Sequence, residues 1–356
     1  MSGGGKRKEN MKAVCAVWTA LCTACMAVML VFASGKTIVI ADVSRDPTGL
    51  TSVQTEGDSG DRELRISRSY GPEGSFRVPL PKGIKAENVV MENRYMDREL
   101  WLYIQGGDRE FYEENVISGD TSPVLSGRSG EQEDGILLKF SMERVLEYKS
   151  TMEGSSLTIA WYEPEELYDC IVVLDAACGG SETGIGDFGM TEKDLTLRVA
   201  RQVQKSLALQ DVRLYLTRTE DTEVSPGDRA ELAEEVGAAF YIRLCASASE
   251  NPEIYGITGI YNEEYFIPGF GNADLADIVT RAVTISASNR AVGLEKAGED
   301  SILRSLRMPA AEISLGYLSN PREEYLLSQE SYQEKLAEGI VTAIEEAAET
   351  RKAAEE

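Results

Sequence analysis

One segment, residues 170–194, constrains the fold of this chain more than any other. It opens with a short apolar run at residues 171–174 that is rich in β-branched side chains and ends in Asp175. Such a run predicts a buried strand. Five glycines follow within residues 179–189, and an apolar residue then recurs every four positions from Leu195. A strand, a glycine-rich loop and a helix in this order predict an α/β domain with its site at the carboxyl end of the strands.

The C-terminal half of the chain continues this alternation of strand and helix patterns. Apolar runs at residues 212–217, 238–245 and 300–306 predict further strands. The pattern from residue 332 onward predicts an amphipathic helix. We therefore predict a three-layer α/β/α domain over residues 169–350.

The middle of the chain has a different pattern. Residues 37–168 contain short alternating or apolar runs separated by Gly, Pro and Asp. This predicts a small all-β domain that resembles a sandwich. Residues 119–135 are polar, acidic and rich in glycine, which predicts a mobile surface loop. Pro164 and its acidic neighbours predict the linker to the last domain.

The N-terminal 36 residues predict a membrane anchor. Four basic residues lie within residues 1–12, and residues 13–33 carry no charge. About 20 apolar residues suffice to cross a bilayer as a helix, and the basic flank stays in the cytoplasm. We therefore expect a single-pass protein of the cell membrane whose bulk is extracytoplasmic. A cleaved signal peptide is the alternative.

Two features of the composition limit the function. The formal net charge of −24 argues against nucleic acid as a partner, because phosphate binding needs a basic surface. The chain of 356 residues contains no histidine. Chemistry that depends on imidazole as a base or as a metal ligand is therefore excluded.

The segment 170–194 resembles the zinc-dependent N-acetylmuramoyl-L-alanine amidases, which cut the amide between glycan and peptide in peptidoglycan. The family motif is a strand, Asp-Pro-Gly-His-Gly-Gly, a loop, and Thr-Glu-Lys at the start of a helix. Three further matches extend the resemblance to about residues 169–348. The matching residues are Asp175, Gly179-Gly180, Thr191-Glu192-Lys193, Thr217-Arg218 with Asp221, Arg229, and the segment 308–320. The resemblance implies a three-layer α/β/α domain with a mixed sheet.

The same resemblance places the site of the family on altered residues. The metal ligands His, Glu and His of the family fall on Cys178, Glu192 and Cys245, and its catalytic glutamate falls on Ser314. Only Glu192 is retained. A serine hydroxyl does not act as a base near neutral pH without a partner. The resemblance therefore implies a degenerate site with no catalytic residue in place.

Three interpretations of the cysteine pair are open. Cys178 and Cys245 could be inert residues that fill the former metal pocket, or they could form a disulfide in an exported protein. They could also bind zinc together with Glu192, because thiolates are good zinc ligands. Glu192 could instead have a local role, since a carboxylate is favoured at a helix start. We expect no cofactor, with zinc as the alternative.

These observations lead to three hypotheses about function. The first is a membrane-anchored, catalytically inactive relative of the cell-wall amidases that binds peptidoglycan or a protein of the cell envelope. The second is an active amidase with an altered Cys/Glu/Cys zinc site. The third is a purely structural spacer. Likeness of fold does not choose among them.

Two charged residues on predicted strands complete the expectations. Arg243 lies two residues before Cys245, and Glu312 lies two residues before Ser314. Because strand side chains alternate between faces, each shares a face with its neighbouring site position. The family places a small hydroxyl residue and an aliphatic residue at these positions, on two adjacent strands. We predict that Arg243 and Glu312 form an ion pair in the degenerate site.

Overall fold

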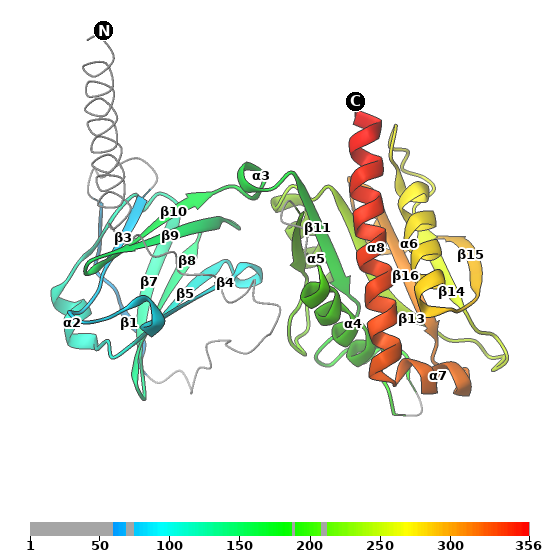
Figure 1. Cartoon of the computed structure of the whole chain (residues 1–356), viewed down its shortest axis with the longest axis horizontal. Coiled ribbons are helices and arrows are strands. Elements are labelled where there is room, and N and C mark those ends of the chain that lie inside the picture. Colours follow the sequence, from blue (N-terminus) through cyan, green and yellow to red (C-terminus); the bar gives the residue numbers. More distant parts are fainter. Residues whose placement is uncertain (1–59, 69–74, 187–188, 208–211, 356) are drawn as a thin grey trace, which may run out of the picture.

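The computed structural model describes residues 60–68, 75–186, 189–207 and 212–355 of the chain. The predicted anchor at residues 13–33 lies outside these residues. Among the helices that the structure describes, none is long and apolar enough to cross a membrane. The described residues form two five-stranded sheets, followed by a six-stranded sheet with helices on both faces (Figure 1).

The two five-stranded sheets pack against each other as a sandwich. Phe76 of one sheet and Phe140 of the other lie edge to face with ring centroids 5.1 Å apart, and both are fully buried. Helix α2 (Arg109–Glu114) joins the two sheets. One sheet has the order β1 (Arg62–Glu63), β7 (Val124–Gln132), β8 (Gly135–Met142), β5 (Glu99–Gln105) and β4 (Val89–Arg94). The other has the order β2 (Ile66–Arg68), β6 (Ile117–Gly119), β3 (Ser75–Pro79), β10 (Ser156–Tyr162) and β9 (Glu147–Glu153).

The prediction of a mobile loop at residues 119–135 was wrong, because most of this segment is strand β7. Its glycines have a packing role. A Cβ atom on Gly127 would lie 2.8 Å from Ile66 Cδ1, and one on Gly130 would lie 2.5 Å from Asp61 Oδ1. The glycines therefore let the segment 61–66 lie close against β7. In this case glycine makes room for side chains of a neighbouring segment and does not indicate a turn.

One further prediction about local structure was wrong. The strand predicted at residues 300–306 contains a 3-10 turn, η4 (Ile302–Arg304), because the Ser301 hydroxyl accepts a hydrogen bond from the Leu303 amide at 3.3 Å. The segment around Pro164 connects the sandwich to the last domain where the linker was predicted, and it forms a short helix, α3 (Pro164–Leu167). The Glu163 amide, just before this helix, donates to the Glu166 carboxylate at 2.8 Å. Local capping hydrogen bonds therefore order both segments.

The third sheet is mixed, as predicted, and helices cover both of its faces. Strands β12, β11, β13 and β16 are parallel, β14 is antiparallel to β16, and β15 is parallel to β14. The order is β12 (Val212–Leu216), β11 (Cys170–Ala176), β13 (Phe240–Ser247), β16 (Ala310–Tyr317), β14 (Ile257–Tyr261) and β15 (Ala291–Lys296). The helices are α4 (Glu192–Ser206), α5 (Pro226–Glu235), α6 (Asn272–Ala287), α7 (Pro321–Leu327) and α8 (Glu330–Glu355).

Alternation along β11 explains how the faces of this sheet are used. All seven residues of β11 are buried, as expected for a central parallel strand. Val172 and Leu174 pack in the core that contains α4, α6 and α8. Ile171 and Val173 pack in the core that contains α5. Asp175 therefore shares the α5 face, at the carboxyl end of the strand.

Candidate functional site

A cleft of about 400 Å³ lies on the α5 face, beside β13 and β16. Basic and acidic side chains line it together. The charged residues are Glu182, Arg229, Arg243, Lys296, Asp300 and Glu312. The cleft therefore offers both signs of charge to a ligand.

Asp175 forms the centre of a buried network below this cleft. Its side chain has no solvent exposure, and it accepts hydrogen bonds from Thr217 Oγ1 and from the Tyr241 hydroxyl, each at 2.6 Å. The Nη1 atoms of Arg229 and Arg243 also donate to its two carboxylate oxygens. Burial alone would raise the pKa of Asp175, but the two arginines and the hydroxyl donors lower it below its ordinary value. The carboxylate is therefore ionised in the folded protein.

The predicted ion pair between Arg243 and Glu312 is present in the structure. The two residues face each other across β13 and β16, and Arg243 Nε lies 3.2 Å from Glu312 Oε2. The side chains are 19% and 20% exposed. Burial raises the pKa of Glu312, although Arg243 acts in the opposite direction. Sequence reasoning did not identify the second carboxylate partner of Arg243, which is Asp175.

The structure brings Cys178 and Cys245 into one small buried cluster with Ala177. Both thiols are free. Cys178 follows β11 with φ at 62°, in the left-handed region that is unusual for a residue other than glycine. Cys245 lies on β13, and its thiol donates to Glu312 Oε1 at 3.4 Å. Burial, followed by the Glu192 carboxylate, raises the pKa of the Cys178 thiol to about 12.

Glu192 connects three parts of the site. It is the first residue of α4, and it is buried. Its Oε1 accepts a hydrogen bond from the Ala246 amide at 2.9 Å, and its Oε2 accepts one from the Ile185 amide at 3.1 Å. The helix itself is capped by Thr191, whose hydroxyl accepts from the Asp194 amide at 3.3 Å. Glu192 therefore ties the loop after β11 to strand β13.

Two of the three side chains at the ligand positions of the family are engaged by partners within the protein. Both oxygens of Glu192 are engaged by backbone amides, and the Cys245 thiol is turned to Glu312. Across the described part of the chain, no three Cys, Asp or Glu side chains are arranged to hold a metal ion.

Ser314 occupies the position that the resemblance assigns to the catalytic glutamate. It is fully buried on β16, directly opposite Cys245 on β13. Its hydroxyl donates to the Ser247 hydroxyl at 2.7 Å. A pair of hydroxyl groups supplies no base near neutral pH.

Arg218 is a structural residue of the site whose role sequence reasoning missed. It is 2% exposed, and its guanidinium donates to the carbonyls of Ala176, Ala177 and Lys193 at 3.0, 3.0 and 2.8 Å. It thereby joins the end of β11 to the first turn of α4. Burial and the nearby Arg229 lower its pKa. The signal in the sequence was the Thr217-Arg218 pair, which matches the family but does not by itself assign a role.

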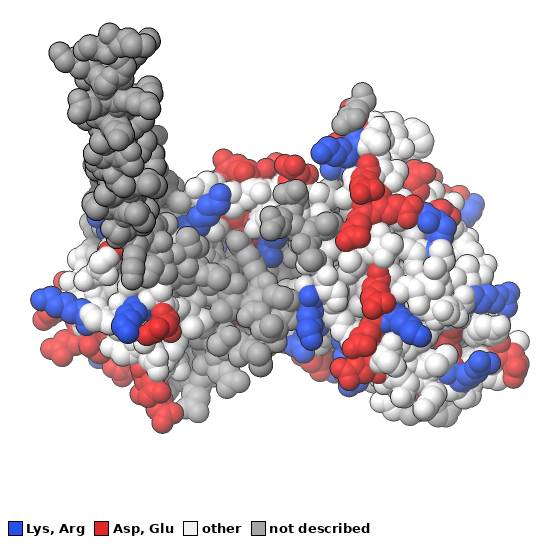
Figure 2. All heavy atoms as spheres, in the orientation of Figure 1, with Lys and Arg blue, Asp and Glu red and all other residues white. Residues whose placement is uncertain are grey.

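The surface charge agrees with the acidic composition. Figure 2 shows acidic and basic side chains over both domains on the face in view, with a row of acidic side chains along α8. The coloured, described residues of this face form no continuous basic area. This face does not resemble a nucleic-acid-binding surface.

Comparison with known proteins identifies the family of the second domain. The cell wall amidase LytH of Staphylococcus aureus, which is itself described as probable, is 27% identical over 187 residues. The match covers 51% of this chain and 60% of that relative, so this chain spans less than two thirds of the length of that relative.

Two solved structures are also similar. The catalytic domain of the amidase CwlV from Bacillus (Paenibacillus) polymyxa var. colistinus is 26% identical, with a TM-score of 0.46, over 50% of this chain and 97% of that one. An N-acetylmuramoyl-L-alanine amidase of Clostridium difficile 630 is 30% identical, with a TM-score of 0.47, over 50% of this chain and 95% of that one.

Residues 172–346 match the family described as N-acetylmuramoyl-L-alanine amidase. They contain most of strand β11, the cleft and Asp175 with its two arginines, so the match covers the whole site described above. Through this domain, the chain belongs to the N-acetylmuramoyl-L-alanine amidase family.

Proposed function

We propose that this protein binds peptidoglycan, or a partner associated with it, through the amidase-like cleft and does not hydrolyse amide bonds. One observation carries the proposal. The cleft is closed at its base by the network of Asp175, Arg243 and Glu312, and Ser314, buried on the same strand as Glu312, has a hydroxyl where the family has a carboxylate.

The chemistry of the family explains why these changes matter. Amide hydrolysis there needs a zinc ion that lowers the pKa of bound water to about 7. It also needs a carboxylate that takes the proton of the water and passes it to the leaving nitrogen. Cys178, Cys245 and Ser314 stand at three of these positions, and the chain has no histidine to replace them.

The cleft retains features that suit a peptide ligand. Lys296 can attract a carboxylate, and Asp300 and Glu182 can attract an amino group. Peptides of the cell wall carry both kinds of group. A site with both signs of charge favours such a ligand by electrostatic complementarity, without any need to break a bond.

We place the protein in the cell envelope, anchored through residues 13–33 and with the described domains outside the cytoplasm. The support is the uncharged segment with its basic flank and the similarity to a relative described as a probable cell wall amidase.

The proposal is tested by co-sedimentation of the purified protein with insoluble peptidoglycan, followed by analysis of the released peptides. We expect binding, no release of peptide, and less than stoichiometric zinc in protein purified from zinc-supplemented cells. Lys296→Glu reverses a charge in the cleft and should weaken binding about tenfold. The matched control is Lys335→Glu, an exposed position on α8, on the opposite side of the sheet.

Each other outcome identifies a different function. Zinc-dependent release of peptide that Glu192→Ala abolishes would establish an active amidase with an altered Cys/Glu/Cys site. Absence of binding by the wild-type chain would exclude peptidoglycan as the ligand and leave a protein partner or the structural spacer.

A further inference from the structure

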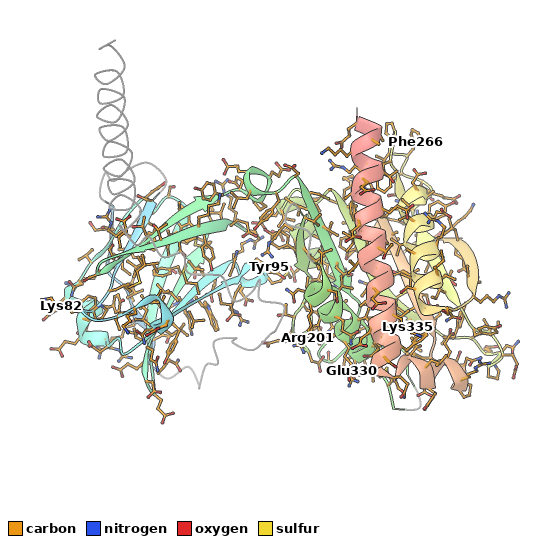
Figure 3. All side chains as sticks on the ribbon, viewed as in Figure 1. Lys82, Tyr95, Arg201, Phe266, Glu330 and Lys335 are labelled. Atoms are coloured by element: carbon orange, nitrogen blue, oxygen red, sulfur yellow. The ribbon has the colours of Figure 1, made fainter. Side chains whose placement is uncertain are left out.

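The sandwich contacts the amidase-like domain at the outer edge of β12. Tyr95 belongs to a 3-10 turn, η3 (Tyr95–Asp97), between β4 and β5, and Figure 3 shows it at the side of the sandwich that faces the second domain. Its hydroxyl donates to the Leu216 carbonyl and accepts from the Leu216 amide, each at 3.0 Å. Leu216 lies on an edge strand, whose outer backbone groups need partners. The sandwich therefore covers an edge that would otherwise be open.

A charged pair is buried at the same contact. Glu147 of β9 has no solvent exposure and accepts hydrogen bonds from Arg213 Nε and from the Tyr215 hydroxyl, each at 2.6 Å. The Arg213 side chain is 8% exposed, and its guanidinium carbon lies 4.5 Å from the centroid of the Tyr215 ring. One charge comes from each domain. Separation of the domains would expose both and break every one of these contacts.

A second set of contacts joins the sandwich to helix α5. Arg98 Nη2 lies 2.8 Å from Glu235 Oε2 and 2.5 Å from Glu231 Oε1. The Val145 amide donates to Glu235 Oε1 at 2.6 Å.

Apolar side chains of both domains also share one core. Its members include Tyr95 and Val145 of the sandwich and Ile171, Val173, Tyr215, Leu232 and Val236 of the second domain.

From these contacts we infer that the sandwich and the amidase-like domain form one folding unit, in which the sandwich is a fixed cover on the β12 and α5 side of the second domain. The sandwich is then not a binding module on a flexible tether. Any ligand surface on it has a constant direction relative to the cleft. The inference does not depend on which ligand the cleft binds or on whether it is catalytic.

The positions of the tryptophans allow a direct test. Trp101 and Trp161 lie in the sandwich, and the third tryptophan is Trp18. In the chain with Trp18→Phe, fluorescence therefore reports on the sandwich alone. Circular dichroism in the far ultraviolet reports mainly on α4, α6 and α8 of the second domain. We expect urea unfolding of this chain to give coincident transitions by the two probes. Two separate transitions would overturn the inference.

A variant of the sandwich distinguishes coupled unfolding of the two domains from two independent transitions that have the same midpoint by chance. Glu147→Gln with Arg98→Ala changes only residues of the sandwich. Coupled domains predict that the midpoint measured by circular dichroism falls together with the fluorescence midpoint. An unchanged midpoint by circular dichroism would contradict the inference. Arg98→Ala alone is the milder variant if the double variant does not fold. The matched control is Arg62→Ala, which removes an exposed ion pair with Glu113 inside the sandwich and should leave the circular dichroism midpoint unchanged.

Discussion

Arg243 lies between two carboxylates, those of Glu312 and Asp175, and Glu312 pairs with it across adjacent strands at 3.2 Å. The two carboxylates differ in their surroundings. Asp175 has no exposure and also binds Arg229, whereas the Glu312 side chain is 20% exposed and has Arg243 as its charged partner. The network therefore depends more on Asp175 than on Glu312.

The first prediction ranks these two carboxylates by stability. Asp175→Asn should lower the free energy of unfolding by about 3–5 kcal/mol, because two buried guanidinium groups lose their shared carboxylate. Glu312→Gln should lower it by about 1 kcal/mol or less, because Arg243 keeps Asp175. Urea unfolding at neutral pH measures both changes. An equal loss in the two variants would show that Arg243 depends on Glu312 as strongly as on Asp175.

The second prediction concerns pH. The pKa of Asp175 is lowered in the fold from its ordinary 3.8, so its contribution to stability is complete above that value and is lost as the pH falls below it. The pKa of Glu312 is raised from its ordinary 4.5, so its contribution is complete below that value and is lost as the pH rises through the higher folded pKa. The stability difference between wild type and Asp175→Asn should therefore shrink in acid. The difference between wild type and Glu312→Gln should grow in acid, and parallel curves for the two variants would contradict this assignment.

Some of this site could be predicted from sequence, because it depends on local rules. Strand alternation placed Arg243 and Glu312 on the same face as Cys245 and Ser314, and the family resemblance implied that the two strands are adjacent. The pair was found there. The contact of Arg243 with Asp175 also needs the register of β11 against β13, which no local pattern contains. Similarly, the contact of Tyr95 with Leu216 joins residues 121 positions apart in the chain. Composition indicated the sandwich but not its attachment to the second domain.

The predictions about loops failed for a related reason. Glycine and acidic residues at 119–135 indicated a mobile segment, whereas the structure uses Gly127 for close contact with Ile66. From sequence alone, a glycine that permits a turn and one that permits close packing are identical. The role of Glu192 was equally hidden, because its partners Ile185 and Ala246 are brought to it by the loop and by β13.

The third prediction concerns the thiols. Because only the thiolate reacts, a pKa of about 12 for Cys178 should make its alkylation at mildly alkaline pH at least about 100-fold slower in the native protein than in urea. Burial also raises the pKa of the Cys245 thiol, so we expect Cys245 to be alkylated slowly in the native protein as well. Peptide mapping after timed alkylation measures each site separately. Rapid native labelling, or a disulfide between Cys178 and Cys245, would show that this pair is not an inert part of the core.

The last prediction tests whether Glu192 organises the loop after β11. Gly184 has φ at +66°, and a Cβ atom there would lie 2.4 Å from Glu192 Oε2 and 2.7 Å from Cys178 Sγ. Gly189, in the same loop, has φ at +122° but no atom within 4 Å of its Cβ position. Both substitutions by alanine strain the backbone, but only Gly184→Ala also displaces the carboxylate. We expect Gly184→Ala to cost about 2–3 kcal/mol of stability and Gly189→Ala about 1 kcal/mol.

The two variants should also differ in the reactivity of Cys178. Displacement of Glu192 frees the Ile185 and Ala246 amides and opens the packing around the thiol. Alkylation of Cys178 should therefore accelerate in Gly184→Ala and stay at the wild-type rate in Gly189→Ala. Cys170 lies in the other core of the sheet, so its alkylation rate controls for global unfolding. If Cys178 is alkylated at the same rate in both variants, the Glu192 carboxylate does not hold this loop. The strained backbone at Cys178 is then maintained by Arg218, through its hydrogen bonds to the Ala176 and Ala177 carbonyls.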